Sequence, residues 1–319
     1  MTPVDAPDLD LQRVFADEAV EHLRRTPRQL PSKYFYDALG SALFEAICCL
    51  PWYRITRSES MLLHEHALDI LDGFPRPLTL AELGCGSGDK LATLAARAGE
   101  RFQSIHLVDI SPSALDAARR RIELLRSGPV VLHQGTYEDG IRQLLHARHD
   151  GAMLVLFLGS NIGNYEPAPA QELLSHVRSA LRAGDALLLG SDLVKPERDL
   201  LLAYDDPLQV TAAFNRNVLR RVNDELGGTF DLDAWAHRAV WNAARSRVEM
   251  HLVSRAAQVV RIETADFEIA FQPGETIWTE SSYKYQPEDI VRMGQAAGYT
   301  AARQWIDETA RFALTRLSA

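Results

Sequence analysis

The chain has 319 residues, which is more than one small domain usually needs and favours two domains or one elaborated domain. Hydrophobic residues make up 46% and charged residues 24% of the sequence, as in ordinary globular proteins, so neither a disordered chain nor a fibre is expected. The 34 basic and 43 acidic side chains leave a net charge of −9, which gives no general attraction to nucleic acid or to an anionic membrane.

Neither a membrane anchor nor a disulfide framework is evident in the sequence. The longest apolar runs are short strand candidates such as 153–158, far below the roughly 18 residues that a membrane span requires. The N-terminus, MTPVDAPDLDLQ, is acidic where a signal peptide has a basic start and an apolar centre. Cys48 and Cys49 are adjacent and Cys85 stands alone, a spacing that indicates no disulfide. We therefore expect a cytoplasmic protein of a reducing compartment.

The centre of the chain alternates predicted strands with predicted helices. Leu78–Leu83 is an apolar strand candidate, and a Gly-rich turn separates it from a helix over Asp89–Ala98. After a strand at 105–108, Ser111 is placed to cap a helix that has Pro112 at its first position. Further strands are predicted at 130–132, 153–158 and 186–189, with a helix at 171–181. This alternation predicts an α/β protein with a parallel, doubly wound sheet.

The pattern changes after about residue 194. Helices are predicted at 200–226 and 231–242, antiparallel strand patterns at 248–253 and 259–271, a helix at 287–297, and strands at 301–306 and 311–317. The simplest organisation is one α/β domain interrupted by an insertion. We expect residues 59–194 with 285–319 to form the cofactor-binding domain, and residues 1–58 with 195–284 to form an α+β substrate-binding lobe.

The strongest local signal is the turn ELGCGSGDK, residues 82–90. A strand runs into three alternating glycines and then into a helix whose free N–H groups face a ligand. Asp109 follows at the end of the next strand, where a carboxylate accepts both hydroxyls of a ribose. A dinucleotide site would need a third glycine at Asp89, whose carboxylate would face a pyrophosphate. The spacing instead matches the E-x-G-x-G-x-G turn of class I methyltransferases, which bind the phosphate-free cofactor S-adenosylmethionine.

A second polar loop, LGSNIGNY at 158–165, follows the fourth predicted strand. In doubly wound sheets, ligands bind beyond the carboxyl ends of the strands. Asparagine amides in such a loop are able to hold an amine, although Asn and Gly are also common in turns that bind nothing.

At this point the chain resembles a known family, the histidine Nα-methyltransferases of ergothioneine biosynthesis. The resemblance spans nearly the whole chain. It rests on SKYFYDALGSALFEAICCLPWYRITR, ELGCGSGDK, FLGSNIGNYEPAPA, LLLGSDLVK, AYDDPLQVTAAFNRNVLRRVNDEL, RVEMHLV and TESSYKYQPE. It implies a Rossmann-like class I methyltransferase fold that ends in an antiparallel strand pair, with S-adenosylmethionine as cofactor and S-adenosylhomocysteine as product.

The resemblance also implies which residues hold the cofactor. These are the turn glycines Gly84 and Gly86, Lys90 opening the next helix, the ribose acid Asp109, and Tyr36. The adenine is usually held by an Asp-Phe pair, and Thr136-Tyr137 stands at that position here. Tyr137 is still able to stack on the adenine, but Thr136 replaces an acid that accepts from the adenine amino group. We expect weaker cofactor binding unless Glu138 or Asp139 compensates.

The implied substrate is L-histidine. Tyr53 and Asn164 correspond to residues that hold the α-amine, Tyr204 to one that contacts the carboxylate, and Glu280 with Ser282 to the pair that binds the imidazole. A carboxylate accepts an imidazole N–H, a hydroxyl serves the other ring nitrogen, and a thioether packs on the ring face. The remaining implied substrate residues are Met250 as that apolar wall, Gly159 and Ser281.

The expected reaction is an in-line attack of the neutral α-amine on the sulfonium methyl group, repeated three times to give the trimethyl betaine hercynine. Catalysis is expected to depend mainly on alignment of the two reactants. The resemblance implies that the catalytic residues are Tyr36, Tyr53 and Asn164. The tyrosine rings would face the growing ammonium group. No dedicated general base is evident in the sequence.

Two alternatives remain open. The first is the same reaction on another amino acid, such as tryptophan or tyrosine; the second is a non-catalytic, regulatory S-adenosylmethionine-binding protein, which the Thr136 departure favours. Nucleic acid is not an expected substrate, because no basic patch with interleaved aromatics is present. No metal is expected, since His64 and His66 face different sides of a helix and His146 and His149 have no further ligands nearby in sequence. We expect a monomer.

Overall fold

The computed structural model describes residues 9–98, 102–126, 128–146 and 150–319. The acidic residues 1–8 and His149 lie outside this described part. The chain divides into two compact units. Unit 1 consists of the described part of Met1–Tyr53 together with Pro196–Ser282, and unit 2 consists of Arg54–Lys195 together with Tyr283–Ala319.

Unit 2 is built on a seven-stranded sheet with the order β11-β12-β5-β4-β1-β2-β3. The five strands from β5 to β3 are parallel, β12 is antiparallel to β5, and β11 is antiparallel to β12. The predicted fold class, a doubly wound sheet with a C-terminal antiparallel strand pair, is therefore confirmed. The strands are β1 (Leu78–Leu83), β2 (Phe102–Asp109), β3 (Val130–Gln134), β4 (Ala152–Phe157), β5 (Ala186–Asp192), β11 (Ala301–Asp307) and β12 (Phe312–Ser318).

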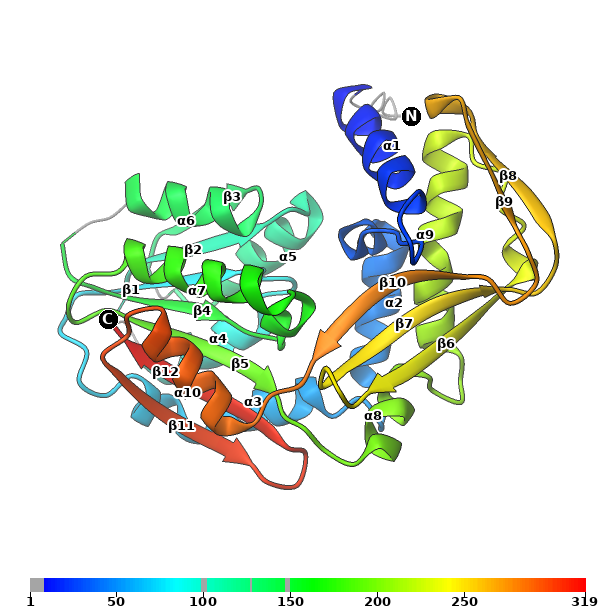
Figure 1. The fold of residues 1–319 in the computed structure, drawn as a ribbon. Coiled ribbons are helices and arrows are strands. Elements are labelled where there is room, and N and C mark those ends of the chain that lie inside the picture. The colour runs from blue at the N-terminus through cyan, green and yellow to red at the C-terminus, as the bar shows by residue number, and fades with distance from the viewer. Residues whose placement is uncertain (1–8, 99–101, 127, 147–149) are drawn as a thin grey trace. The chain divides into compact units, whose positions relative to one another are not determined.

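Helices cover both faces of this sheet (Figure 1). One face carries α3 (Ile55–Ile70), α4 (Asp89–Ala98) and α5 (Pro112–Glu123); the other carries α6 (Tyr137–His146), α7 (Pro167–Ala180) and α10 (Pro287–Ala296). The predicted start of α5 is confirmed, because Ser111 Oγ accepts from the Ala114 N–H at 3.3 Å and Pro112 occupies the first turn.

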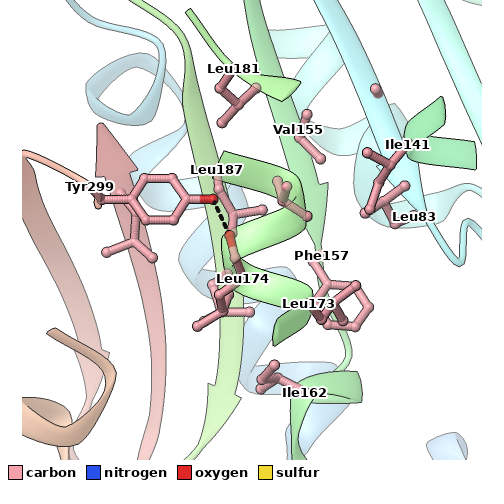
Figure 2. Close-up of a cluster of buried hydrophobic side chains, with 14 of the residues drawn as sticks. Leu83, Ile141, Val155, Phe157, Ile162, Leu173, Leu174, Leu181, Leu187 and Tyr299 are labelled. Carbon is pink, nitrogen blue, oxygen red and sulfur yellow. Dashed lines mark hydrogen bonds between the residues drawn. The ribbon is translucent and has the colours of Figure 1, made fainter. Parts of the chain in front are cut away.

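The sheet face under α6 and α7 is filled with hydrophobic side chains (Figure 2). Leu83, Val155 and Leu187 project from three neighbouring strands and pack with Leu174 of α7. Side chains alternate along a strand, so Glu82, next to Leu83 in β1, points to the opposite face, which α3 and α4 cover. This alternation places a carboxylate beneath the Gly-rich turn.

Unit 1 combines helices with two small antiparallel sheets (Figure 1). A three-stranded sheet has the order β10-β7-β6, a hairpin pairs β8 with β9, and α9 packs against β6 and β7. Its elements are α1 (Leu9–Leu23), a 3-10 turn (Ser32–Phe35), α2 (Ala38–Cys49), α8 (Glu197–Tyr204), α9 (Val210–Leu226), β6 (Trp235–Asn242), β7 (Arg247–Ser254), β8 (Gln258–Ile262), β9 (Phe267–Phe271) and β10 (Thr276–Tyr283).

Two helix predictions in unit 1 are wrong. The segment predicted as a helix at 231–242 is mainly strand β6, since its aromatic and β-branched residues suit a sheet and it pairs along its length with β7. The stretch predicted as one helix at 200–226 breaks into α8 and α9. The break follows from Asp206, whose carboxylate accepts from the backbone N–H groups of Leu208, Val210 and Thr211 and so begins a new helix.

Candidate active site

The Gly-rich turn after β1 adopts a backbone that side chains would oppose. Gly84, Gly86 and Gly88 have φ values of 74°, 51° and 75°. The Gly84 N–H donates to the Val108 carbonyl of β2 at 2.8 Å, which fixes the turn to the sheet. A Cβ at Gly88 would lie 2.8 Å from Ala118 Cβ, whereas a Cβ at Gly86 would meet nothing within 4 Å. The turn is therefore closely packed against Ala118 of α5 at Gly88, whereas Gly86 has free space beside it.

Asp109, at the end of β2, faces this turn. One carboxylate oxygen accepts from the Gly86 N–H at 3.0 Å and the other from the Ser111 N–H at 2.9 Å. An ionised carboxylate has about four acceptor positions, so each oxygen is able to accept one further hydrogen bond. The arrangement fits the two hydroxyls of a ribose, as the sequence predicts.

Lys90, in the first turn of α4, forms an ion pair with a residue that sequence reasoning missed. Its Nζ lies 2.6 Å from Glu59 Oε2, and the Glu59 side chain on α3 is fully buried. The Gly159 N–H, just after β4, donates to both Glu59 oxygens at 2.8 and 3.0 Å. Gly190 makes room for this carboxylate, because a Cβ there would lie 2.0 Å from Glu59 Oε1. Glu59 thus neutralises Lys90 and holds the loop after β4.

Glu82 lies buried near this ion pair. Its Oε2 has no hydrogen-bond partner within the described part of the chain. Burial raises the pKa of Glu82 to about 8, the negative charges of Glu59 and Asp109 add to this effect, and Lys90 opposes it. Glu82 is therefore mainly protonated at neutral pH. The set of oxygen atoms and balanced charges fits a cationic, phosphate-free nucleoside better than a pyrophosphate.

Thr136 and Tyr137 begin α6. Thr136 Oγ1 donates to Asp139 Oδ2 at 3.0 Å and accepts from the Asp139 N–H at 3.2 Å, so it serves as the helix cap. The Asp139 carboxylate is also paired with Arg142 at 3.3 Å. Tyr137 packs edge-on against Phe157 at 5.0 Å between ring centroids, and burial raises the pKa of its phenol. Tyr137 therefore offers a neutral aromatic ring at this position, while Asp139 is already engaged by Thr136 and Arg142.

The loop after β4 lies beside the Gly-rich turn because β4 pairs with β1 in parallel. Gly159 and Ser160 adopt left-handed φ values of 76° and 58°, and Ser160 Oγ accepts from the Asp192 N–H at 2.9 Å. A 3-10 turn over Asn161–Asn164 follows, with Asn164 exposed. The loop therefore has a constrained backbone at its start and presents the Asn164 amide to solvent.

In unit 1, aromatic rings join three of the predicted tyrosines. Tyr36 lies 5.7 Å from Phe44, Phe44 lies 6.3 Å from Tyr53, and Tyr53 lies 6.3 Å from Tyr204, all edge-on and between ring centroids. Such arrangements are the favoured geometry of aromatic pairs. Tyr53 and Tyr204 are buried, so their positions are set by this packing.

The predicted imidazole-binding residues lie on β10 and β7. The Tyr204 hydroxyl lies 2.8 Å from Ser282 Oγ. Glu280 and Ser282 lie on the same face of β10 because they are two residues apart, and Ser281 between them points to the other face. Met250 is buried on β7, the strand next to β10. The structure thus brings Tyr53, Tyr204 and Ser282 into one contiguous group.

Metal-binding clusters and membrane-spanning helices are both absent from the described ranges. No group of three His, Cys, Asp or Glu side chains there is arranged to hold a metal ion. His64 contacts Arg97, and His66 stacks on Trp305 with ring centroids 6.2 Å apart. Among the described helices, none combines the length and the apolar character that crossing a bilayer requires.

The sheet order, the Gly-rich turn and the carboxylate of Asp109 at the end of β2 are typical of a class I methyltransferase. Residues 15–319 match the family described as histidine-specific methyltransferase, SAM-dependent. The chain is 42% identical over 311 residues to the histidine N-alpha-methyltransferase of Mycolicibacterium smegmatis, covering 94% of this chain and 96% of that protein. It is 38% identical to the histidine N-alpha-methyltransferase of Mycobacterium tuberculosis, covering 98% and 95%. The chain therefore belongs to the S-adenosylmethionine-dependent, histidine-specific methyltransferases.

A third relative is a longer fungal protein. Ergothioneine biosynthesis protein 1 of Neurospora crassa is 28% identical over 302 residues, which are 88% of this chain and 32% of the fungal protein. The recognition made from the sequence motifs is confirmed by these matches.

Proposed function

We propose that the protein methylates the α-amine of L-histidine three times to give hercynine, the first step of ergothioneine biosynthesis. The observation that carries the proposal is the hydrogen bond between Tyr204 of α8 and Ser282 of β10, the strand that also bears Glu280. A phenol, a hydroxyl and a carboxylate are thereby placed together in unit 1. Family membership and the names of the relatives support the same reaction.

The proposed cofactor residues are Tyr36, Gly84, Gly86, Lys90, Asp109, Thr136 and Tyr137. When bound, S-adenosylmethionine supplies an electrophilic methyl group on a sulfonium centre. Asp109 accepts the ribose hydroxyls, and the Tyr137 ring stacks on the adenine. Lys90 pairs with the cofactor carboxylate while Glu59 balances its charge, which allows a lysine to serve a cationic ligand.

The proposed catalytic residues, Tyr36, Tyr53 and Asn164, act by orientation. Asn164 and Tyr53 hold the neutral amine so that its lone pair faces the methyl carbon, and such alignment supplies about 7–11 kcal/mol of the barrier in well-oriented reactions. The phenol rings of Tyr36 and Tyr53 attract the ammonium group as methyl groups accumulate.

The proposed substrate residues favour histidine over larger aromatic amino acids. Glu280 accepts one imidazole N–H, Ser282 serves the other nitrogen, and Met250 packs on the ring. Tyr204 binds the substrate carboxylate, and Gly159 and Ser281 complete the set. A tryptophan or tyrosine side chain would leave one of the polar groups without a partner, which discriminates strongly in buried sites.

We propose that unit 2 binds the cofactor and that unit 1 binds the amino acid. We also propose that the protein acts as a monomer in the cytoplasm. Sedimentation velocity of the purified protein at several concentrations tests the monomeric state. Fractionation of cells of the source organism tests the cytoplasmic location.

The decisive experiment incubates the purified protein with S-adenosylmethionine and all twenty amino acids and detects products by mass spectrometry. We expect mass gains of one, two and three methyl groups on histidine alone. Methylation of a different amino acid would overturn the assigned substrate but keep the enzyme class. Cofactor binding by calorimetry with no methylation of any amino acid would instead favour the regulatory alternative.

A further inference from the structure

A ring of interactions, made of hydrogen bonds and closed through the covalent chain of Tyr204 and of residues 279–282, supports the proposed substrate residues in unit 1. The Tyr204 carbonyl lies 2.8 Å from His237 Nε2, and His237 Nδ1 lies 2.8 Å from Asn215 Nδ2. Asn215 Oδ1 lies 2.7 Å from Thr279 Oγ1. Thr279 precedes Ser282 on β10 by three residues, and Ser282 Oγ lies 2.8 Å from the Tyr204 hydroxyl, which closes the ring.

The members of this ring come from four elements that are distant in sequence. Tyr204 ends α8, Asn215 lies on α9, His237 on β6, and Thr279 with Ser282 on β10 (Figure 1). The His237 side chain is 1% exposed, and Asn215 and Thr279 are 0% and 3% exposed. Buried polar groups are costly unless they are hydrogen-bonded, so this ring fixes its members in one arrangement.

The ring determines where its protons lie. The Asn215 amide nitrogen donates one hydrogen to His237 Nδ1 and the other to the His251 carbonyl at 3.2 Å, while its oxygen accepts from Thr279. His237 Nδ1 must therefore be unprotonated, and Nε2 carries the hydrogen that it donates to the Tyr204 carbonyl. The network assigns His237 as the neutral Nε2–H tautomer.

Protonation of His237 would break the ring. An Nδ1–H would face the Asn215 N–H, and rotation of the amide would put Asn215 Oδ1 against the His251 carbonyl, which is also only an acceptor. Burial lowers the pKa of His237; the Asp205 and Asp206 carboxylates and the bond to the Tyr204 carbonyl oppose this, and Arg216 adds to it. The neutral form therefore persists to a lower pH than in a free histidine.

We propose that His237, Asn215 and Thr279 are positioning residues that hold Tyr204 and the Glu280–Ser282 segment in their substrate-binding geometry, and that they do so only while His237 is neutral. This inference rests on the proposed function, because Tyr204, Glu280 and Ser282 are substrate residues only under it. A rigid support of this kind lets the groups that contact a ligand keep their geometry without reorganising on binding.

The first test compares Thr279→Val with Thr279→Ser. Valine has nearly the same shape but removes the hydroxyl that contacts Asn215 Oδ1 at 2.7 Å and the Met250 carbonyl at 3.0 Å, whereas serine keeps that hydroxyl. We expect the KM for histidine to rise about tenfold in Thr279→Val and to change little in Thr279→Ser. The affinity for S-adenosylmethionine, measured alone by calorimetry, should stay within about twofold in both. Equal KM values in the two variants, with equal melting temperatures, would overturn the proposal.

The second test reverses the proton requirement. In Asn215→Asp, the new carboxylate only accepts, so it favours a protonated His237 that donates to the carboxylate and to the Tyr204 carbonyl. The free substrate ionises equally in assays of both proteins. We therefore compare the ratio of the histidine KM of this variant to that of the wild type at each pH, which removes the effect of substrate ionisation. We expect that ratio to fall at least threefold between pH 8 and pH 6. A constant or rising ratio would refute the role of neutral His237.

The tautomer itself is measurable without turnover. In the wild-type protein labelled with 15N-histidine, we expect His237 to show a protonated Nε2 and an unprotonated Nδ1 at pH 7.5, assigned by its absence in His237→Gln. The opposite tautomer or an imidazolium at that pH would overturn the ring. If the wild-type protein does not methylate histidine, the proposed function is wrong. If the wild type is active but Thr279→Val and Asn215→Asp leave the histidine KM unchanged, only this inference is wrong.

Discussion

The two units support the residues that we propose as ligand-binding groups with different kinds of interaction. In unit 2 the support is ionic: the buried Glu59 carboxylate meets the Lys90 ammonium at 2.6 Å. In unit 1 it is neutral: an amide, an imidazole and hydroxyls share hydrogen bonds of 2.7–2.8 Å. A charged pair suits a site for a cationic cofactor, since it fixes a loop without adding net charge. The neutral network adds directional hydrogen bonds without adding net charge, which suits discrimination among amino acids.

The comparison also shows where each unit is vulnerable. Removal of one member of a buried ion pair leaves a charge without compensation and is strongly destabilising. Removal of one member of a neutral ring leaves a dipole unsatisfied, which costs about 1–3 kcal/mol. Substitutions in unit 2 should therefore have the larger effects on folding, and those in unit 1 on selectivity.

The largest effect is expected for Glu59→Gln. This change leaves Lys90 without its counter-charge and weakens the bonds to the Gly159 N–H, so we expect a loss of about 3 kcal/mol in the free energy of unfolding. Urea denaturation provides the measurement. The matched control is Glu59→Gln with Lys90→Met, which removes both charges and should recover part of the loss. A double variant that is no more stable than Glu59→Gln alone would contradict a favourable ion pair.

The second prediction addresses selectivity in unit 1. The double variant Glu280→Ala, Met250→Val removes the proposed imidazole acceptor and shortens the proposed apolar wall. We expect the preference for histidine over tryptophan, as a ratio of kcat/KM, to fall by about 100-fold. Competition assays with both amino acids provide the measurement. Val259→Ala, an exposed residue of β8 outside the proposed substrate residues, serves as the control and should retain the wild-type preference.

The third prediction concerns pH and Glu82. Because burial raises the pKa of Glu82 to about 8 from its ordinary value of 4.5, the folded state holds a proton that the unfolded state releases. Its contribution to stability is fully present below pH 4.5 and is lost as pH rises through 8. We expect the wild type to lose about 2–3 kcal/mol of unfolding free energy relative to Glu82→Gln between pH 6 and pH 9. Parallel stability curves for the two proteins would show that Glu82 does not titrate in this range.

The sequence predicts the sheet unit well because its signals are local. The apolar run Leu78–Leu83, the glycines that follow it and the Ser111 cap each specify structure within a few residues, and each is found as expected. Strand β6 was mistaken for a helix because its pairing partner, β7, decides its conformation, and no pattern inside 231–242 reveals that partner.

The supporting residues escaped prediction for the same reason. Glu59 has the sequence context of an ordinary helical glutamate, and only the fold brings it to Gly159, 100 residues away. His237 and Asn215 likewise meet through contacts between β6 and α9. The proposed ligand-binding residues belong to recognisable motifs, whereas the residues that support them are defined by tertiary packing.

The smallest effect tests whether unit 2 accepts an additional charge at its adenine position. Thr136→Asp restores the acid that the family usually places there, and aspartate is also a good helix cap, so α6 should begin unchanged. The new carboxylate would face Asp139, which now accepts from the Thr136 hydroxyl, so the gain is expected to be modest. We expect the Kd for S-adenosylmethionine to fall about threefold in calorimetry, and further when Asp139→Asn removes the repulsion. Thr136→Ser, which keeps the cap without the acid, should bind like the wild type. If Thr136→Asp folds normally but binds S-adenosylmethionine no more tightly, residue 136 does not accept a hydrogen bond from the adenine amino group.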